Sequence, residues 1–447
     1  MSGERIPLAD HVADAVALLA GVRTTEVIAL DGAATGRVAA AELRSRVDVP
    51  GADNSQMDGY AVASADLRGD GEEVTLPLGD VIAAGDAPGT LAPGTARAIM
   101  TGAPIPGGAD LVIPVEESAA GRFAPTDGSG RSADGGAADG DAADGVTADG
   151  RAIDAQATGA TITFTPVSTA PGRFVRPRGS DTRSGDTVLR EGRPLTPARI
   201  AHLAACGLRD VEVEVRLRVI VLSTGSEVTA PSADAPAPGG VHDANGPGLA
   251  AALTEAGAEV VHVGTVRDDA DVLLGHLREQ VARHDADLVV TSGGVSQGAF
   301  EVVRHAAAHR GVTLAFPTVA MQPGGPQGIG TLEVDGRRVP WLAFPGNPVS
   351  ALLSCELIAR PALGAPPRRR LHLPVQLEAD EPSPSRLDQY RRARVLPSGR
   401  VRLVGGPSSH LIGGYAAADA LARIPVGTAT LRDGDVVETL LIPGGDA

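Results

Sequence analysis

Residues 291–298 are Thr-Ser-Gly-Gly-Val-Ser-Gln-Gly, and residues 344–351 are Phe-Pro-Gly-Asn-Pro-Val-Ser-Ala. Each segment ends an apolar, β-branched run, at 288–291 and at 339–344, and the second leads into a helical pattern at 349–359. Such loops are typical of the carboxyl ends of parallel strands, where open α/β sheets bind ligands. Glycine lets the backbone approach a ligand closely, and amides at a helix start favour anionic oxygens. We therefore expect a pocket for a phosphorylated small molecule.

The surrounding sequence predicts a doubly wound α/β domain at residues 216–365. Strand patterns and helix patterns alternate through it, and Asp335-Gly336 marks a hairpin turn before the last strand. This alternation is the signature of parallel strands joined by helical crossovers. The expected elements are strands at 217–222, 259–263, 288–291 and 312–316, and helices at 248–256, 271–284 and 302–309.

The rest of the chain is expected to form three further domains. Helical patterns at the start of the chain and at 196–207 predict a discontinuous N-terminal linker domain, residues 1–49 plus 167–215. Between its halves, residues 50–166 are rich in Gly, Pro, Val and Thr, which indicates an inserted β domain. Within it, the Asp-Gly-Ala tract 126–160 is predicted to be a solvated, disordered loop. Residues 366–447 predict a C-terminal β-barrel.

Composition excludes several classes of protein. The 447 residues carry a net charge of -16, which argues against nucleic acid or an anionic membrane as the main partner. All 39 basic residues are arginine, so a Walker-type phosphate lysine and a Schiff-base lysine are excluded. Cys206 and Cys355 lie in apolar helical patterns and are expected to be buried thiols. Without a signal-peptide or membrane-span pattern, we expect a soluble, cytoplasmic protein.

Carboxylates gather at the predicted strand ends. Glu227 follows the first strand, Asp243 and Asn245 precede the first helix, and Asp268, Asp269 and Glu301 follow later strands. Asp243, Asp268 and Asp269 would each serve as helix N-caps, and Glu301 would favour a helix N-terminus. Together they place negative charge on the ligand-binding face. Carboxylates beside a phosphate site favour a divalent cation such as Mg²⁺, for which Asp268 and Glu301 are the predicted ligands.

Five strings carry a resemblance that spans most of the chain. They are Asn-Ser-Gln-Met-Asp-Gly-Tyr-Ala-Val at 54–62, Met-Thr-Gly-Ala-Pro at 100–104, Ser-Thr-Gly at 223–225, Thr-Ser-Gly-Gly-Val-Ser at 291–296 and Pro-Gly-Asn-Pro-Val-Ser at 345–350. In this order the chain resembles the molybdopterin molybdenumtransferase family, MoeA or the gephyrin E domain. The resemblance implies a MogA-like molybdopterin-binding domain that inserts molybdate into adenylylated molybdopterin, releasing AMP and molybdenum cofactor with the help of Mg²⁺.

The resemblance also implies a homodimer with the active site between subunits. Its implied partners are adenylylated molybdopterin and molybdate, the adenylyltransferase of the same pathway, and recipient molybdoenzymes. The catalytic residues it implies are Asp58, Thr101, Asp181 and Glu227. The predicted substrate-binding residues are Ser223, Thr224, Gly225, Asp243, Asn245, Ser292, Gly293, Gly294, Ser296, Pro345, Gly346, Asn347, Pro348 and Ser409. Within this set, the amides of Gly293, Gly294 and Gly346 are expected to hold phosphate oxygens.

Glu301 stands where the family has an aspartate, and the clearest departure from the family lies at three other positions. Members commonly carry lysines in the segment 318–326, where this chain has Thr318, Gln322 and Gly325. The missing charge should weaken oxyanion binding unless an arginine compensates, and Arg176, Arg178 and Arg183 are candidates. Three alternative functions therefore stay open: a molybdopterin adenylyltransferase, a paralogue that prefers tungstate, and a non-catalytic pterin-binding scaffold.

Overall fold

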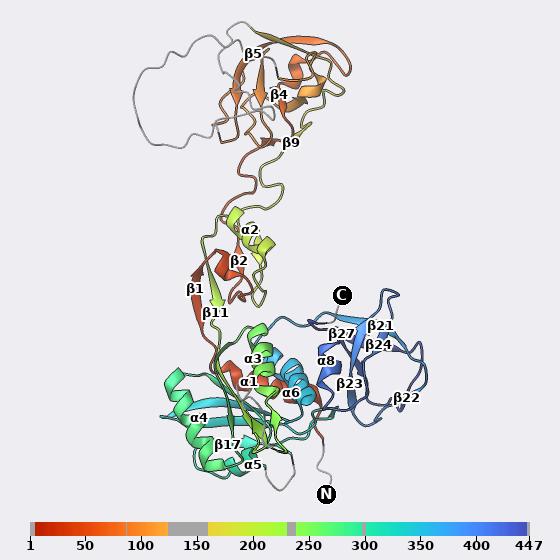
Figure 1. The fold of residues 1–447 in the computed structure, drawn as a ribbon. Coiled ribbons are helices and arrows are strands. Elements are labelled where there is room, and N and C mark those ends of the chain that lie inside the picture. Colours follow the sequence, from red (N-terminus) through yellow and green to blue (C-terminus); the bar gives the residue numbers. More distant parts are fainter. Residues whose placement is uncertain (1–4, 86, 124–159, 230–237, 297–300, 445–447) are drawn as a thin grey trace. The chain divides into compact units, whose positions relative to one another are not determined.

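The computed structural model describes residues 5–85, 87–123, 160–229, 238–296 and 301–444 (Figure 1). Nearly all of the tract predicted to be disordered, 126–160, lies outside these residues. Contacts divide the chain into two compact units. The first contains residues 1–41, 191–196 and 212–447, and the second contains 42–190 and 197–211. The boundaries of the four predicted domains remain a prediction.

A six-stranded sheet forms the centre of the first unit. Its strand order is β15 (Glu259–Val266), β12 (Arg218–Thr224), β16 (Leu288–Ser292), β20 (Arg337–Phe344), β19 (Gly328–Val334) and β17 (Val312–Ala315). The first four strands are parallel, whereas β19 is antiparallel to both β20 and β17. Asp335 and Gly336 both have positive φ at the β19–β20 turn, so the hairpin predicted there is confirmed.

Strict alternation along the strands builds two cores. In β12, Val219 and Val221 pack on one face with the helices α1 (Leu8–Ala20), α3 (Asn245–Glu255) and α6 (Pro348–Ser354). Ile220 and Leu222 pack on the other face with α4 (Ala270–His284) and α5 (Val302–Ala306) (Figure 1). A strand buried on both faces is typical of a doubly wound domain, so this fold class is confirmed.

Two predicted helical details need correction. The helix predicted at 349–359 is regular only over α6, and a wider turn at Cys355–Ala359 then leads into α7 (Arg360–Ala362). In the last domain, where only strands are expected, the short helix α8 (Ile412–Ala416) forms. Cys206 and Cys355 are buried free thiols as predicted, and burial raises the pKa of Cys355 to about 12.

The last domain is a closed barrel within the first unit. Its strands are β21 (Arg370–Gln376), β23 (Asp388–Val395), β24 (Val401–Leu403), β25 (Ala420–Ile424) and β27 (Val436–Leu441). Closure follows because β23 pairs with both β24 and β25. The short strands β22 (Glu381–Pro382) and β26 (Thr430–Leu431) pair beside it, and β18 (Met321–Gln322) extends the sheet by pairing with β23. This last pairing attaches the loop before β19 to the barrel.

The second unit is built around a five-stranded β sheet. Its order is β7 (Leu111–Pro114), β4 (Gly59–Val62), β6 (Ala96–Ile99), β5 (Val74–Ile82) and β8 (Thr161–Phe164). The pairs β2 (Leu43–Arg44) with β10 (Thr187–Leu189) and β3 (Asn54–Ser55) with β9 (Val175–Arg176) join distant segments, and α2 (Pro197–Ala205) contacts β10. Elsewhere β1 (Thr25–Ala29) pairs with β11 (Asp210–Glu214). In the described part of the chain, no helix is both long and apolar enough to cross a membrane.

Candidate functional site

A wide pocket opens at the carboxyl ends of the parallel strands of the first unit. It encloses about 2370 Å³, with the open solvent at its mouth included. Most of the site residues predicted in this unit line it: Ser223, Thr224, Gly225, Glu227, Asp243, Asn245, Asp268, Gly293, Gly294, Ser296, Glu301, Pro345, Gly346, Asn347, Pro348 and Ser409. These residues come from segments far apart in the sequence. The structure therefore joins the two glycine-rich loops and the strand-end carboxylates in one place.

The loop after β12 folds a carboxylate back over its own glycine. Gly225 has φ +146, and a Cβ there would lie 2.8 Å from Glu227 Oε1. Glycine is favoured here because other residues rarely adopt this φ. Asp268 holds the same loop in place, because its Oδ2 accepts a hydrogen bond from the Ser226 amide at 2.9 Å. Asp268 thus braces the loop instead of capping a helix, whereas Asp269 caps α4 by accepting from the Val272 amide at 3.0 Å.

Asp243 organises the start of α3. Its Oδ1 accepts hydrogen bonds from the Ser223 hydroxyl at 2.8 Å and from the Asn245 and Gly246 amides at 3.0 Å each. The expected capping role of Asp243 is therefore confirmed. Asn245 in turn donates from Nδ2 to the Gly346 carbonyl at 2.7 Å, which links the two sides of the pocket. Its Oδ1 is buried and has no partner in the described residues.

The Gly293–Gly294 loop lets neighbouring backbone segments pack closely, but the Gly293 amide does not have the role predicted for it. The Gly293 amide donates to the Phe344 carbonyl at 2.9 Å, so it is not free to hold a phosphate oxygen. A Cβ on Gly346 would lie 3.4 Å from Gly293 Cα, and one on Gly293 would lie 2.6 Å from Thr224 Oγ1. Glycine is therefore required at 293, where a Cβ would also lie 2.6 Å from the Thr224 carbonyl oxygen, whereas at 346 a Cβ would make an ordinary contact. At the far end of the loop, Glu301 accepts from the Ser296 amide at 3.0 Å and from its hydroxyl.

Ser292 does not line the pocket. Its side chain is buried, and its carbonyl accepts from the Thr224 hydroxyl at 3.2 Å. Ser292, predicted to bind substrate, is therefore the one predicted binding residue of this unit that is absent from the pocket lining. Ser292 is the last residue of β16, where the strand is still buried on both faces. It therefore supports Thr224, which lines the pocket, from the interior of the domain.

The barrel domain completes the pocket through the loop 408–410. The Ser409 carbonyl accepts a hydrogen bond from the Val349 amide at 3.1 Å. This amide in the first turn of α6 is therefore not available to a ligand. The Ser408 hydroxyl lies 2.7 Å from Nδ1 of His410, whose side chain lines the pocket beside Ser409. Sequence reasoning missed His410. The same holds for Ser226, His242, Pro323, Gly324, Pro326 and Ser350.

The described lining of this pocket is acidic. It includes the carboxylates Glu227, Asp243, Asp268 and Glu301 and two histidines, but neither lysine nor arginine. Cations lie close behind the lining: Arg304 donates to the carbonyl of the lining residue Val295 at 2.9 Å, and Arg5 contacts the loop 318–326. A Cβ on Gly325 would lie 3.2 Å from Nη1 of Arg5, which donates to the Val319 carbonyl at 3.4 Å. Gln322, another of the positions where family members commonly carry lysine, accepts a hydrogen bond from Gln389 Nε2 of the barrel at 3.0 Å.

The remaining predicted residues lie in the second unit. The amide and hydroxyl of Thr101 donate to Asp58 Oδ1 at 2.7 and 2.8 Å, so these two residues, distant in sequence, form one hydrogen-bonded pair. The Asp181 amide donates to the Val49 carbonyl at 3.0 Å. Of the arginines proposed to compensate for lysine, Arg178 is paired with Asp48 at 2.5 Å.

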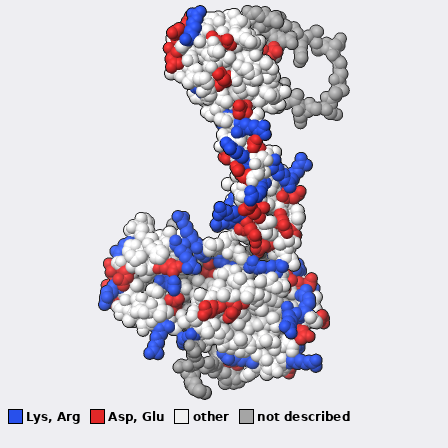
Figure 2. Space-filling view, turned by 180° about the vertical axis from the view of Figure 1, so that it is seen from behind, with Lys and Arg blue, Asp and Glu red and all other residues white. Residues whose placement is uncertain are grey.

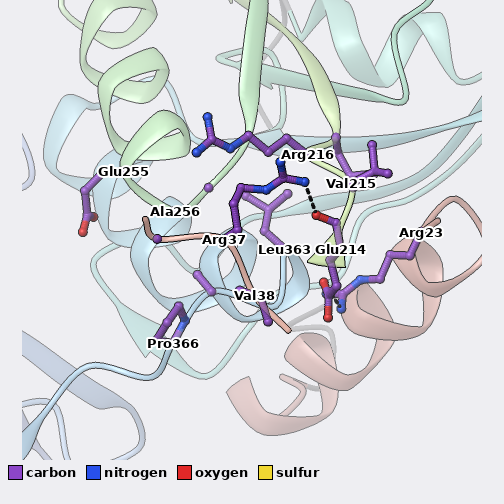
Figure 3. Close-up of a pocket in the computed structure, with 14 residues that line it drawn as sticks. Arg23, Arg37, Val38, Glu214, Val215, Arg216, Glu255, Ala256, Leu363 and Pro366 are labelled. Carbon is purple, nitrogen blue, oxygen red and sulfur yellow. Dashed lines mark hydrogen bonds and ion pairs between the residues drawn. The ribbon is translucent and has the colours of Figure 1, made fainter. Parts of the chain in front are cut away.

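A smaller cleft of about 580 Å³, with the open solvent at its mouth included, lies elsewhere in the first unit, beside the end of α3 (Figure 3). Arg23 donates to the Glu214 carboxylate at 3.2 Å and to the Ala362 carbonyl at 2.6 Å. Arg37 donates to the Glu214 carbonyl at 2.7 Å (Figure 3). These bonds commit the two guanidinium groups to holding neighbouring segments together. We interpret the cleft as a packing seam.

Acidic and basic side chains are interspersed on the molecular face drawn in Figure 2. Elsewhere in the described part of the chain, acidic and basic side chains form ion pairs, such as Arg37 with Glu26 at 2.5 Å and Arg368 with Glu255 at 2.5 Å. Paired surface charges of this kind contribute little stability each. The face shown therefore gives no reason to revise the expectation that nucleic acid is not the partner.

Three family models match the chain. They are described as "MoeA N-terminal region (domain I and II)" at residues 6–207, "Probable molybdopterin binding domain" at 220–365 and "MoeA C-terminal region (domain IV)" at 374–442. Among curated relatives, molybdopterin molybdenumtransferase 2 of Mycobacterium tuberculosis is 40% identical over 405 residues, covering 88% of this chain and 89% of the relative. Molybdopterin molybdenumtransferase 1 of the same organism is 32% identical, covering 92% and 93%.

A solved structure shares the architecture. The molybdopterin biosynthesis MoeA protein from Pyrococcus horikosii is 26% identical and superposes with a TM-score of 0.71, covering 99% of this chain and 100% of that one. The multidomain fold predicted from the sequence is therefore confirmed.

The hydrogen bonds of Asp243 predict that this carboxylate is structural. Asp243→Ala leaves the Ser223 hydroxyl and two amides without their acceptor, and should destabilise the first unit by about 1–3 kcal/mol. Urea unfolding followed by the fluorescence of Trp341, the only tryptophan, measures this because the residue is buried in the α/β sheet. Asp269→Ala, which removes one N-cap bond, is the matched control and should cost about 1 kcal/mol. Equal, negligible effects would contradict the structural role.

Proposed function

This chain belongs to the molybdopterin molybdenumtransferase family and is a transferase of molybdenum cofactor biosynthesis, and we propose that the pocket at the carboxyl ends of β12, β15, β16 and β20 holds its adenylylated molybdopterin. The reaction inserts molybdate into this substrate and releases AMP. Relatives matched over nearly their whole length carry the transferase name, which favours this function over adenylylation or a scaffold role.

One observation carries the assignment of the site. A single pocket gathers polar groups from both glycine-rich loops, the start of α3, the loop after β15 and the barrel. Its size suits a ligand larger than a simple phosphate. The buried, unpartnered Oδ1 of Asn245 is an acceptor that a ring N–H of a pterin would satisfy. Next to it, Pro345 and Pro348 give the loop a rigid backbone against which a flat ring system can rest.

We further propose Mg²⁺ as the cofactor of this pocket. The donor set fits, because the carboxylates of Asp268 and Glu301 are hard oxygen ligands and both line the cavity. Among the described residues, no three His, Cys, Asp or Glu side chains are grouped to hold a metal alone. Mg²⁺ commonly binds through one or two carboxylates plus substrate phosphates, so substrate oxygens would complete the shell. When bound, the ion polarises the phosphoanhydride and offsets its charge.

The protein's own groups position the reactants. Glu227 projects over Gly225 at the pocket wall, where its carboxylate can orient an incoming water by accepting a hydrogen bond from it. Asp268 and Glu301 keep their places because the amides of Ser226 and Ser296 donate to them. Ser409 and His410 close the barrel side and can donate to anionic oxygens. Catalysis on this account is positional and electrostatic.

Release of AMP from adenylylated molybdopterin, measured anaerobically with Mg²⁺, tests this function. We expect molybdate to stimulate release by the wild-type chain, with tungstate as the comparison oxyanion. Asp268→Asn and Glu301→Gln should each raise the Mg²⁺ concentration for half-maximal release on the order of tenfold, because each removes one anionic ligand. Asp269→Asn is the control, since Asp269 caps α4 and does not line the pocket.

Two results would count against this assignment. Molybdate-independent release by the wild-type chain would contradict the transfer reaction. Unchanged Mg²⁺ dependence in both pocket variants would leave the reaction standing but remove Asp268 and Glu301 as metal ligands.

We also propose a cytoplasmic homodimer in which the Asp58–Thr101 pair serves the pocket of the partner subunit, as the family resemblance implies. Support comes from the pair itself, because a carboxylate held by an amide and a hydroxyl is fixed in one orientation. An inactive Asp58→Asn chain and an inactive Glu227→Gln chain should then complement each other. Random mixing should restore about a quarter of wild-type activity, since half the dimers are mixed and each has one intact site.

Asp58→Asn mixed with Asp58→Asn is the matched control and should stay inactive. No recovery in the mixed sample, with light scattering showing exchanged dimers, would place both residues in one subunit's site. A monomer at assay concentration would contradict the dimer itself.

A further inference from the structure

Three histidines cluster between the edge strand β15 and the helix α4, away from the residues that line the pocket. Nε2 of His262 lies 3.4 Å from Nε2 of His276, and the two ring centroids are 5.4 Å apart. The ring of His284 stacks on His262 with centroids 5.8 Å apart. All three side chains are half-buried. The strand therefore presents an imidazole nitrogen directly to a nitrogen on the covering helix.

The nitrogen–nitrogen distance suits a shared metal better than a shared proton. A strong N–H hydrogen bond has a heavy-atom separation of about 2.7–3.2 Å, so 3.4 Å is long for one. Two nitrogens that bind the same Zn²⁺ tetrahedrally, each at 2.0–2.1 Å, lie about 3.3–3.4 Å apart. We propose that His262 and His276 form a binding site for a divalent transition metal such as Zn²⁺, joining β15 to α4.

The surroundings of His262 favour its metal-binding form. Burial, and then the neighbouring charges of His276, His284 and Arg283, lower the pKa of His262, while Glu279 opposes them. Neutral imidazole is the form that binds metal, so this direction is compatible with the site that the nitrogen–nitrogen distance indicates. Gly264 makes room for the ring, since a Cβ there would lie 3.0 Å from Nε2 of His262.

The rest of the coordination shell would be water. In the described part of the chain, no third His, Cys, Asp or Glu side chain joins this pair in a group able to hold a metal. Nitrogen ligands favour Zn²⁺, Cu²⁺ and Ni²⁺ over the oxygen-seeking Mg²⁺. The histidine site would therefore be chemically distinct from the carboxylate pocket, and Mg²⁺ would not compete with Zn²⁺ for the two imidazoles.

The histidine pair joins the two elements on either side of a turn that contributes to the pocket. β15 ends at Val266, Asp268 braces the pocket loop two residues later, and Asp269 caps α4. A metal held by His262 on the strand and His276 on the helix would fasten the two elements that flank this turn. Bound metal should therefore stabilise the α/β domain against unfolding.

Zinc binding to the full-length chain, prepared without a histidine tag and stripped with a chelator, tests the proposal. Equilibrium dialysis against Zn²⁺ at neutral pH, followed by metal analysis, should show that His262→Asn and His276→Asn each bind one equivalent fewer than the wild-type chain. His284→Asn is the matched control, because that ring only stacks on the pair, and it should keep the equivalent. Zn²⁺ should raise the melting temperature of the wild type and the control more than that of either pair variant.

Wild-type AMP release by the metal-free variants shows that they are folded, because neither histidine lines the pocket. The proposal is overturned if the wild-type chain binds no Zn²⁺, or if both pair variants bind as many equivalents as the wild type. An equivalent lost only in His284→Asn would also overturn it. Since His262→Asn alters an edge strand and His276→Asn a helix surface, failure of one variant to fold leaves the other to decide.

Discussion

Repulsion between like charges is the constraint on which the pocket depends. Glu227, Asp243, Asp268 and Glu301 line one cavity, and the substrate of this family brings phosphates of its own. The structure offsets part of this charge locally. Asp243 accepts hydrogen bonds from a hydroxyl and two amides, and Asp268 and Glu301 each accept an amide hydrogen bond. What remains calls for a cation, which is why Mg²⁺ belongs in the proposed mechanism.

The fold imposes this crowding through the parallel sheet. The strands β12, β16 and β20 are buried on both faces, and their ends converge on one edge of the sheet. Gly293 has no room for a side chain there, because a Cβ would lie 2.6 Å from the Thr224 carbonyl oxygen, and Gly225 has a φ of +146, which other residues rarely adopt. The barrel then closes the cavity from outside, because the Ser409 carbonyl binds the first turn of α6. Positive charge reaches the neighbouring loop through Arg5, which packs where a side chain on Gly325 would stand.

Local patterns were enough to predict the α/β domain, the barrel and most of the pocket. Alternating strands and strand-end glycines depend on short stretches of sequence, so Glu227, Asp268 and the two loops could be placed together. Long-range packing decided the rest. Nothing near His410 signals that its loop docks on α6, and nothing near Gly293 shows that its amide is taken by Phe344. The Asp58–Thr101 pairing and the 3.4 Å approach of His262 to His276 likewise need three-dimensional contacts.

A crystal structure of this chain with adenylylated molybdopterin, grown with Mn²⁺ in place of Mg²⁺ and without molybdate, tests the central claim most directly. Mn²⁺ accepts the same oxygen ligands and gives an anomalous signal that marks its position. The account predicts a peak bridging the substrate phosphates and the carboxylates of Asp268 and Glu301, with the pterin beside Asn245 and Pro345. A pterin bound elsewhere, or a bound pterin whose phosphates carry no metal near these carboxylates, would contradict it.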